Sequence, residues 1–110
     1  MYQVTNRMVR HAWYVSFFIY NIFMKFYYIY VLKSINTTNW IYVGFTKNPI
    51  KRVKEHNTGK SPSTAKYKPF KLIFYEAYRN QKDAKRREKY LKTTKGKTTL
   101  KSMLKVDLSK

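Results

Sequence analysis

Residues 27–52 read YYIYVLKSINTTNWIYVGFTKNPIKR. Two runs rich in aromatic and β-branched residues, 26–32 and 40–45, flank a segment of Ser, Asn and Thr, a pattern typical of an antiparallel β-hairpin. After the second run Asn48 can cap a helix, and Pro49 suits the first helical turn. The stretch therefore predicts a hairpin that leads directly into a basic helix over residues 49–57.

The chain beyond this stretch predicts one more strand and two more helices. Gly59 can end the first helix in the left-handed conformation, and residues 60–69, with two prolines and no apolar period, are predicted to form a loop. A strand is predicted over residues 71–78. Strict alternation along it would place Leu72, Phe74 and Glu76 on one side and Ile73, Tyr75 and Ala77 on the other.

The second helix is predicted to begin after Asn80, with Asp83 in its first turn, and to end before Gly96. Thr98 or Thr99 is expected to cap a short third helix, whose apolar residues follow helical spacing. The predicted order of elements is β-β-α-β-α-α, in a single domain without an internal repeat.

The charge of the chain is strongly positive and unevenly distributed. Lys and Arg total 24 against 5 acidic residues, and residues 47–110 carry 20 of the cations and all five acids. The electrostatic field of so many cations favours a polyanionic partner, and nucleic acid is the preferred one. The alternatives are binding to anionic lipid, or a basic surface that serves only solubility. The chain has no cysteine, which excludes disulfides, thiolate nucleophiles and cysteine zinc sites. This lysine-rich, cysteine-free composition suits the cytoplasm.

Residues 1–25 differ from the rest and are expected to form an N-terminal extension. Their apolar run, 12–24, is too short to cross about 30 Å of hydrocarbon as a helix, so stable membrane insertion is not expected. The preferred interpretation is that Met24 is the authentic start and that the preceding residues are not part of the working protein. A weak membrane anchor is the alternative.

A few residues could carry chemistry, although each has a plainer explanation. Glu88 lies among cations in a predicted helix and could hold a metal or form a surface ion pair. Arg52 could bind a phosphate or be one more solvated cation, and His56, one turn further on, could transfer protons or simply face solvent. Tyr30 and Tyr42 are tyrosines of the predicted strands, where packing is the usual role. Singly, none of these residues decides between the two explanations.

As an ordered set, these residues resemble a known family. Tyr28-Ile29-Tyr30 and Tyr42-Val43-Gly44 look like the paired tripeptides of the GIY-YIG nuclease superfamily, and Arg52 stands where that family places its arginine. The run 52–59 resembles the helix and turn of the small stand-alone members, which are similar to the nuclease domain of the excision-repair C subunit. The run 84–91 resembles the helix that supplies the metal-binding glutamate, which would be Glu88.

The resemblance covers roughly residues 26–104 and leaves 105–110 as a basic tail. It implies an α/β (α+β) domain in which a three-stranded antiparallel sheet is flanked by helices. It also implies metal-dependent hydrolysis of DNA phosphodiester bonds, in DNA repair or processing, on DNA that is branched or damaged. The catalytic residues would be Tyr30, Tyr42, Arg52, His56 and Glu88, with Glu88 holding one Mg²⁺ or Mn²⁺.

Other residues are assigned to binding and to the structural motif. Cations expected to contact the nucleic-acid backbone are Lys47, Lys51, Lys54, Lys66, Lys68, Arg86 and Arg87. Residues expected to belong to the structural motif are Tyr28, Gly44 and Asn57. The lysine that some members carry three residues after the second tyrosine is replaced by Phe45, so Lys47 or Lys51 would have to supply that charge.

Two rival functions remain open from the sequence. One is a basic nucleic-acid-binding module that keeps the scaffold without turnover, and the weaker one is a structural RNA-binding protein. The complete set of two tyrosines, arginine, histidine and glutamate favours the enzyme, because an acid beside a polyanion serves no purpose in a protein that only binds.

Overall fold

The computed structural model describes residues 25–110, which form a three-stranded sheet between two helical layers. The strands are β1 (Tyr27–Ser34), β2 (Ile41–Thr46) and β3 (Phe70–Tyr78). β1 lies at the centre and pairs antiparallel with both neighbours, in the order β2-β1-β3. The predicted hairpin and the predicted antiparallel sheet are therefore confirmed. The proposals for the N-terminal extension concern residues that, apart from position 25, lie outside the described part.

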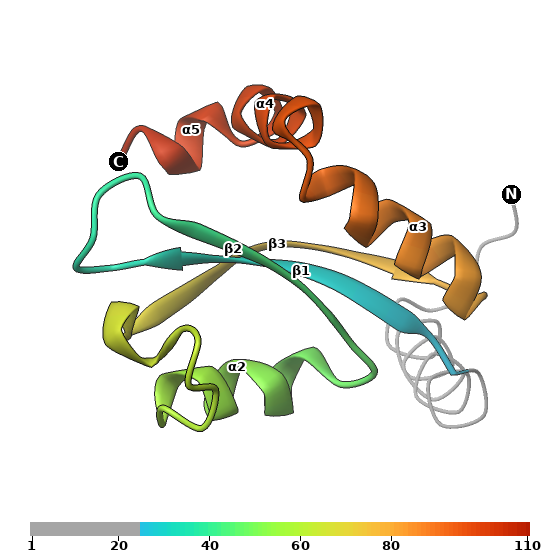
Figure 1. The fold of residues 1–110 in the computed structure, drawn as a ribbon, viewed down its shortest axis with the longest axis horizontal. Helices are drawn as coiled ribbons and strands as arrows, with labels where there is room; N and C mark the ends of the chain where they lie inside the picture. Colours follow the sequence, from blue (N-terminus) through green and yellow to red (C-terminus); the bar gives the residue numbers. More distant parts are fainter. Residues whose placement is uncertain (1–24) are drawn as a thin grey trace, which may run out of the picture.

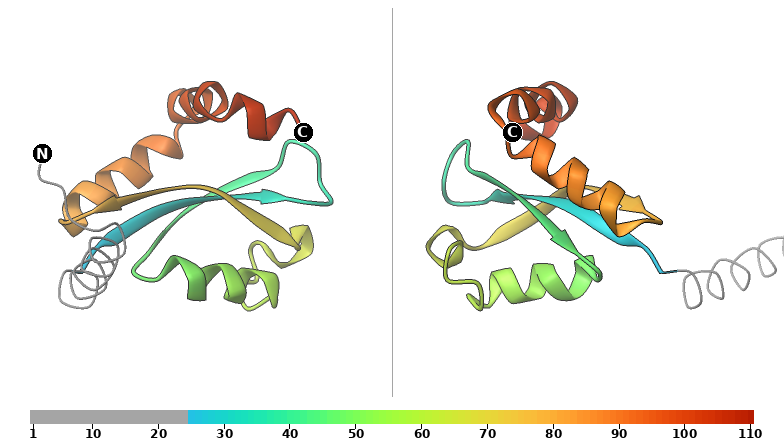
Figure 2. Two further views of the ribbon diagram at one scale, coloured as in Figure 1. Left: turned by 180° about the vertical axis from the view of Figure 1, so that it is seen from behind. Right: turned by 45° about the vertical axis from the view of Figure 1, so that its right-hand side comes forward.

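The helices divide between the two faces of the sheet (Figures 1 and 2). One face is covered by α2 (Pro49–Asn57) and the other by α3 (Gln81–Leu91), followed by α4 (Thr94–Met103) and the short α5 (Lys105–Leu108). The predicted order β-β-α-β-α-α is confirmed. The structure adds α5 in the expected basic tail and a 3₁₀ turn, η1 (Ala65–Tyr67), in the expected loop.

Alternation along the central strand divides the core into two clusters. Ile29 and Val31 are fully buried on the side of α3 and α4, where they pack with Leu91 and Leu100. Tyr30 and Leu32 are buried on the side of α2, in a cluster that also holds Phe70. A tyrosine that is only 1% exposed at the centre of the sheet is thus held in position by its neighbours.

The strict alternation predicted for the third strand is wrong. Between Val31 and Leu32 the register with β3 shifts by one residue, so that Val31 pairs with Phe74 and Leu32 pairs with Leu72. The extra residue, Ile73, forms a β-bulge, and both Ile73 and Phe74 pack on the α3 side. Beyond the bulge Tyr75 pairs directly with Tyr30 and lies on the α2 side, the side that Leu72 also faces.

The helix starts are set by side-chain caps, of which the sequence predicts two correctly. Asn48 accepts a hydrogen bond from the Lys51 amide at 3.1 Å, and Asn80 accepts one from the Lys82 amide at 2.8 Å. The expected cap of the third helix, Thr98 or Thr99, is wrong. Thr93 caps α4 by accepting from the Gly96 amide at 3.0 Å.

Gly96 therefore lies inside α4 and does not end the preceding helix. A Cβ at this position would overlap the carbonyl oxygen of Tyr90 and the Cα of Leu91, so the sharp corner between α3 and α4 requires glycine for close approach. The C-terminal residues are tied back to the central strand by Lys33, whose ammonium donates to the carbonyl oxygens of Asp107 at 2.6 Å and Lys110 at 3.0 Å.

Candidate active site

The Tyr30 side chain forms the floor of the candidate site. Its ring lies over Gly44, its cross-strand partner on β2, and a Cβ at Gly44 would overlap the Tyr30 ring and hydroxyl. Gly44 thus makes room for the tyrosine, which gives the expected structural-motif residue a physical role. Asn57, another such residue, joins the end of α2 to β3 by accepting from the Phe70 amide at 2.6 Å and donating to the Phe70 carbonyl at 3.3 Å.

A buried chain of hydrogen bonds runs from Tyr30 through His56. The Tyr30 hydroxyl lies 2.8 Å from Nε2 of His56, and Nδ1 of His56 lies 2.8 Å from Oγ1 of Thr64. The Thr64 hydroxyl in turn donates to the Ser61 carbonyl oxygen at 3.4 Å. Because a carbonyl only accepts, Thr64 must accept from Nδ1–H of His56, which leaves Nε2 unprotonated. Tyr30 is therefore the donor to Nε2.

The pKa values of both groups favour this neutral pair. Burial raises the pKa of Tyr30 to about 12, although the Arg52 guanidinium beside it acts in the opposite direction. Burial also lowers the pKa of the fully buried His56 below its usual value, and the charge of Arg52 lowers it further. At neutral pH the site therefore holds a protonated phenol against a free imidazole base.

Arg52 and Tyr42 complete the α2 side of the site. The Arg52 guanidinium donates to the Glu55 carboxylate at 3.1 Å, and its side chain is 33% exposed. Hydrogen bonding of that guanidinium with Tyr30 and Glu55 outweighs desolvation and raises the pKa of Arg52. The Tyr42 ring lies 5.2 Å from His56 and 6.2 Å from Tyr30, between ring centroids. The structure thus brings Tyr30, Tyr42, Arg52 and His56 together.

Glu88 lies on α3, on the face of the sheet opposite to the α2 helix that carries Arg52. Its side chain is 16% exposed on α3, and it lies close enough for its charge to raise the pKa of Tyr30. One carboxylate oxygen lies 3.7 Å from the Lys85 ammonium and the other 3.0 Å from the Lys92 ammonium. Glu88 is therefore ion-paired, and its role as a metal ligand stays a prediction.

Glu88 is the carboxylate on which a divalent cation could be held. Mg²⁺ is often held by one or two carboxylates with waters and substrate phosphate, but the two ammonium groups already paired with Glu88 would compete with such a cation. Among residues 25–110, no group of three or more His, Cys, Asp or Glu is placed to bind a metal. The residues present therefore suit a cation held by a single carboxylate and completed by the substrate.

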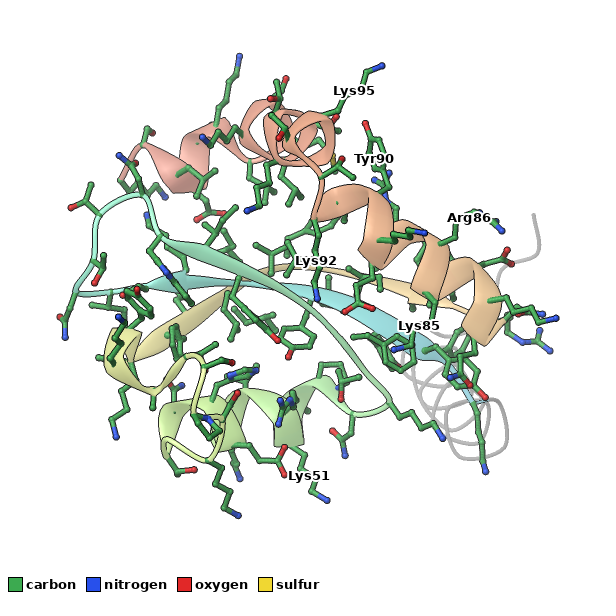
Figure 3. The ribbon with its side chains drawn as sticks, viewed as in Figure 1. Lys51, Lys85, Arg86, Tyr90, Lys92 and Lys95 are labelled. Atoms are coloured by element: carbon green, nitrogen blue, oxygen red, sulfur yellow. The ribbon has the colours of Figure 1, made fainter. Side chains whose placement is uncertain are left out.

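Lys92 is a site residue that the sequence reasoning missed. Lys85 and Lys92 extend from α3 toward the sheet, whereas Arg86 and Lys95 extend away from it (Figure 3). The Lys92 ammonium lies 3.0 Å from Glu88 and 5.9 Å from the centroid of the Tyr42 ring. It thus links the glutamate to the α2-side residues across the edge strand β2. Lys92 follows Glu88 by four residues, a spacing that places two helical side chains on the same face, and this spacing could have predicted the pair from the sequence.

The cations expected to bind nucleic acid are not equivalent in the structure. Most are exposed and lie on the loops and helices around the sheet: Lys47, Lys51, Lys54, Lys66, Lys68 and Arg86. Arg87 is different, because it is half-buried and donates to both oxygens of Glu76 at 2.9 and 3.2 Å. This pair fastens α3 to β3 and leaves few Arg87 donors for a phosphate.

The buried His56 gives a testable pH dependence of stability. Protonation of His56 is disfavoured in the folded state. Between about pH 7.5 and pH 5.5 this histidine therefore binds a proton more readily in the unfolded state than in the folded state. The free energy of unfolding is expected to fall as pH drops through the unfolded histidine pKa, near 6.5. Denaturant unfolding of the full chain at several pH values measures this. His56→Gln should flatten the dependence in this range, and an equal slope in both proteins would contradict the assignment.

Comparison with known proteins shows the family. The family model for the GIY-YIG catalytic domain matches residues 26–101. The chain belongs to the GIY-YIG family. The chain is 39% identical over 69 residues to a UPF0213 protein of Clostridium perfringens, covering 59% of this chain and 69% of the relative. It is 37% identical over 78 residues to a UPF0213 protein of Pediococcus acidilactici, covering 68% and 78%.

The family assignment confirms the resemblance seen in the sequence and makes the domain nuclease-like. A third relative, a UPF0213 protein of Staphylococcus haemolyticus, is 34% identical over 71 residues, covering 64% of this chain and 84% of its own length. Members of the GIY-YIG family generally use a divalent metal. In the part of the GIY-YIG protein that the structure describes, no helix is both long enough and apolar enough to cross a membrane.

Proposed function

We propose that this protein is a metal-dependent DNA endonuclease that hydrolyses phosphodiester bonds, in DNA repair or processing in the cytoplasm. The observation that carries the proposal is the hydrogen bond from the buried Tyr30 hydroxyl to the neutral imidazole of His56, beside Arg52. Packing alone does not require a polar chain of this kind at the centre of a small sheet. Hydrolysis of a phosphodiester does require a base, a cation for the phosphate and a means of stabilising the leaving oxygen.

The tyrosine and histidine would act together as the base. A tyrosine whose pKa is about 12 is almost entirely protonated at neutral pH, so very little phenolate is present to act as a base. In a relay, however, Tyr30 accepts the proton of the attacking water while its own proton passes to Nε2 of His56. The hydroxide equivalent attacks phosphorus and the P–O bond to the leaving oxygen breaks. That oxygen departs as an alkoxide, which takes a proton from solvent, and His56 then returns its extra proton to solvent through Tyr30, so no free phenolate accumulates. Tyr42, packed against His56, would orient the water.

The remaining residues would bind and stabilise the phosphate. Arg52 would bind the non-bridging oxygens of the scissile phosphate and stabilise the charge that develops on them. Glu88 would hold one Mg²⁺ or Mn²⁺, which when bound supplies positive charge beside the leaving oxygen. Lys92 would add a second cation next to Glu88, and the exposed lysines would bind the flanking backbone without reading sequence.

Binding and cleavage of one labelled molecule test the proposal. The protein is mixed with branched DNA, duplex DNA or RNA of the same sequence in chelator, and Mg²⁺ or Mn²⁺ is then added. We expect binding in chelator and strand cleavage of DNA only after the metal is added. Binding without cleavage of any DNA would contradict the enzyme and support the binding module, and preference for RNA would support the RNA-binding alternative.

A further inference from the structure

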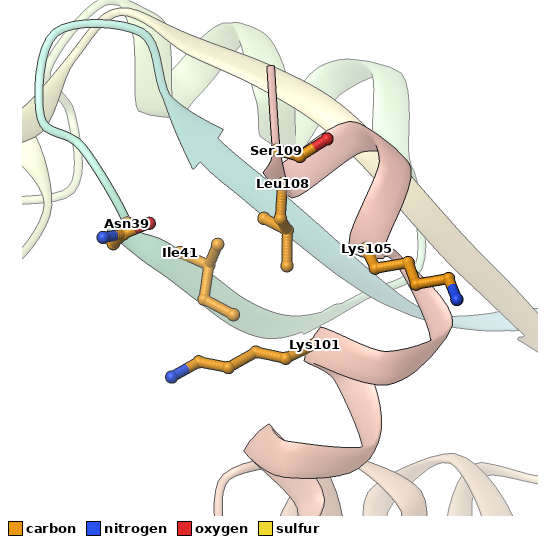
Figure 4. Close-up of a pocket in the computed structure, with 6 residues that line it drawn as sticks. All are labelled: Asn39, Ile41, Lys101, Lys105, Leu108 and Ser109. Carbon is orange, nitrogen blue, oxygen red and sulfur yellow. The ribbon is translucent and has the colours of Figure 1, made fainter.

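A pocket of about 400 Å³ lies beside the candidate active site, where the start of α2 meets the end of the sheet. Its walls include Tyr28, Leu72 and Tyr75 from the sheet and Ile50 from α2, and Lys47 lies at its rim. This volume is within the range of pockets that bind small organic groups. A different pocket, of about 380 Å³ between the hairpin and the C-terminal helices, is lined by aliphatic, lysine, asparagine and serine residues without an aromatic ring (Figure 4).

The pocket beside α2 presents apolar groups that folding leaves exposed. Tyr75 is 58% exposed and Ile50 is 74% exposed, although both line the same concavity. Single exposed apolar side chains are common, but an exposed ring facing an exposed aliphatic residue across a pocket marks a place where a flat apolar group can bind. The rings of Tyr28 and Tyr75 lie 6.2 Å apart at an interplanar angle of 58°, so they do not stack on one another. Because Tyr75 is also largely exposed, part of its ring is accessible to a ligand.

The β-bulge connects this pocket to the chemistry. By shifting the register at Val31/Leu32 it places Tyr75 directly opposite Tyr30 on the same face of the sheet. A group stacked on Tyr75 of β3 would then lie next to Tyr30 on the neighbouring strand β1. If a phosphate of the bound DNA contacts Arg52, the adjacent nucleotide of the same DNA strand would lie within reach of the pocket. Lys47 supplies a cation at the rim for the next phosphate, in a chain whose field already attracts polyanions.

We propose that this pocket binds one unpaired nucleobase of the DNA strand being cut, stacked on Tyr75 and flanked by Tyr28 and Ile50. Its role beside the scissile phosphate rests on the proposed function. Base–aromatic stacking accepts any base, because every base has a π-face, but a base held within a duplex stack cannot enter. The pocket therefore selects DNA that has an unpaired or easily extruded base next to the cleavage site.

The test measures binding of matched oligonucleotides in chelator, where no cleavage occurs. One DNA carries 2-aminopurine in an unpaired flank and the other carries it in a complete duplex of the same sequence. We expect Tyr75→Ala to weaken binding of the unpaired DNA by about 5- to 100-fold and binding of the duplex by less than about twofold. The fluorescence change of the unpaired 2-aminopurine on binding should be lost as well.

Two further variants keep the test independent of folding. Tyr75→Phe retains the ring and should bind both DNAs as the wild type does. Met103 is exposed on α4, and Met103→Ala should leave the affinity for both DNAs unchanged. Equal affinity of wild type and Tyr75→Ala for the unpaired DNA, or an equal loss for both DNAs, would overturn the pocket. If the wild type did not cut DNA in the presence of metal but still bound the unpaired base through Tyr75, the proposed nuclease activity would be wrong and the proposed base-binding pocket would be supported.

Discussion

Glu88→Gln is expected to lower the rate of metal-dependent DNA cleavage by about 100-fold or more. Glutamine keeps the size of the side chain but removes the charge that would hold the cation. The same change should leave DNA affinity in chelator unchanged or slightly higher, because loss of a negative charge cannot weaken attraction to a phosphate. Single-turnover cleavage in Mg²⁺ or Mn²⁺, with a binding titration in chelator, measures both effects.

The control for this substitution lies on the same helix. Asp83 is paired with Arg86 at 2.7 Å, its side chain is 49% exposed, and it lies in the first turn of α3. Asp83→Asn removes the same charge from an exposed ion pair, so cleavage should persist at the wild-type rate. Cleavage by Glu88→Gln at the rate of Asp83→Asn would show that Glu88 is only a partner of Lys85 and Lys92, and the metal assignment would be wrong.

Tyr30→Phe is expected to reduce cleavage by about 100- to 10,000-fold, the usual contribution of general acid–base catalysis. Phenylalanine keeps the ring over Gly44 and removes only the hydroxyl that is hydrogen-bonded to Nε2 of His56. The fold should survive, with a loss of about 1–3 kcal/mol in the free energy of unfolding, because Nε2 of His56 loses its buried partner. Cleavage rates and denaturant unfolding measure the two effects.

Tyr90→Phe provides the matched comparison. It also deletes a tyrosine hydroxyl that makes one hydrogen bond, at 2.9 Å to Thr99, on the helices away from the site. It should lower stability somewhat and leave cleavage unchanged. If Tyr30→Phe cut DNA as fast as Tyr90→Phe, the relay through Tyr30 and His56 would be excluded.

The sequence was most informative where local chemistry sets the structure. The alternating aromatic and β-branched residues predicted the hairpin, and the caps at Asn48 and Asn80 predicted two helix starts. These features depend on neighbours within a few residues, which the sequence shows directly. The family tripeptides likewise placed Tyr30 and Tyr42 correctly on neighbouring strands.

The sequence was least informative where long-range packing decides. The residues around Ile73 do not predict the β-bulge there. The bulge depends on the pairing of β3 with β1, and it brings Tyr75 to the α2 side. The corner at Gly96 arises from the crossing of two helices, so α4 begins before Gly96 and not at the predicted Thr98 or Thr99. The pairing of Arg87 with Glu76 and the approach of Lys92 to Tyr42 also join different elements.

Nicking of a supercoiled plasmid is the most direct test of the central claim, because one broken phosphodiester bond converts the whole molecule to the relaxed form. Wild-type protein and Arg52→Ala, purified in parallel, are incubated with plasmid in Mg²⁺ or Mn²⁺ and in chelator. We predict relaxed plasmid for the wild type with metal, none in chelator, and at least about 100-fold slower nicking by Arg52→Ala. Plasmid that stays supercoiled with wild type and metal, or equal nicking by both proteins, would contradict a nuclease site built on Tyr30, His56 and Arg52.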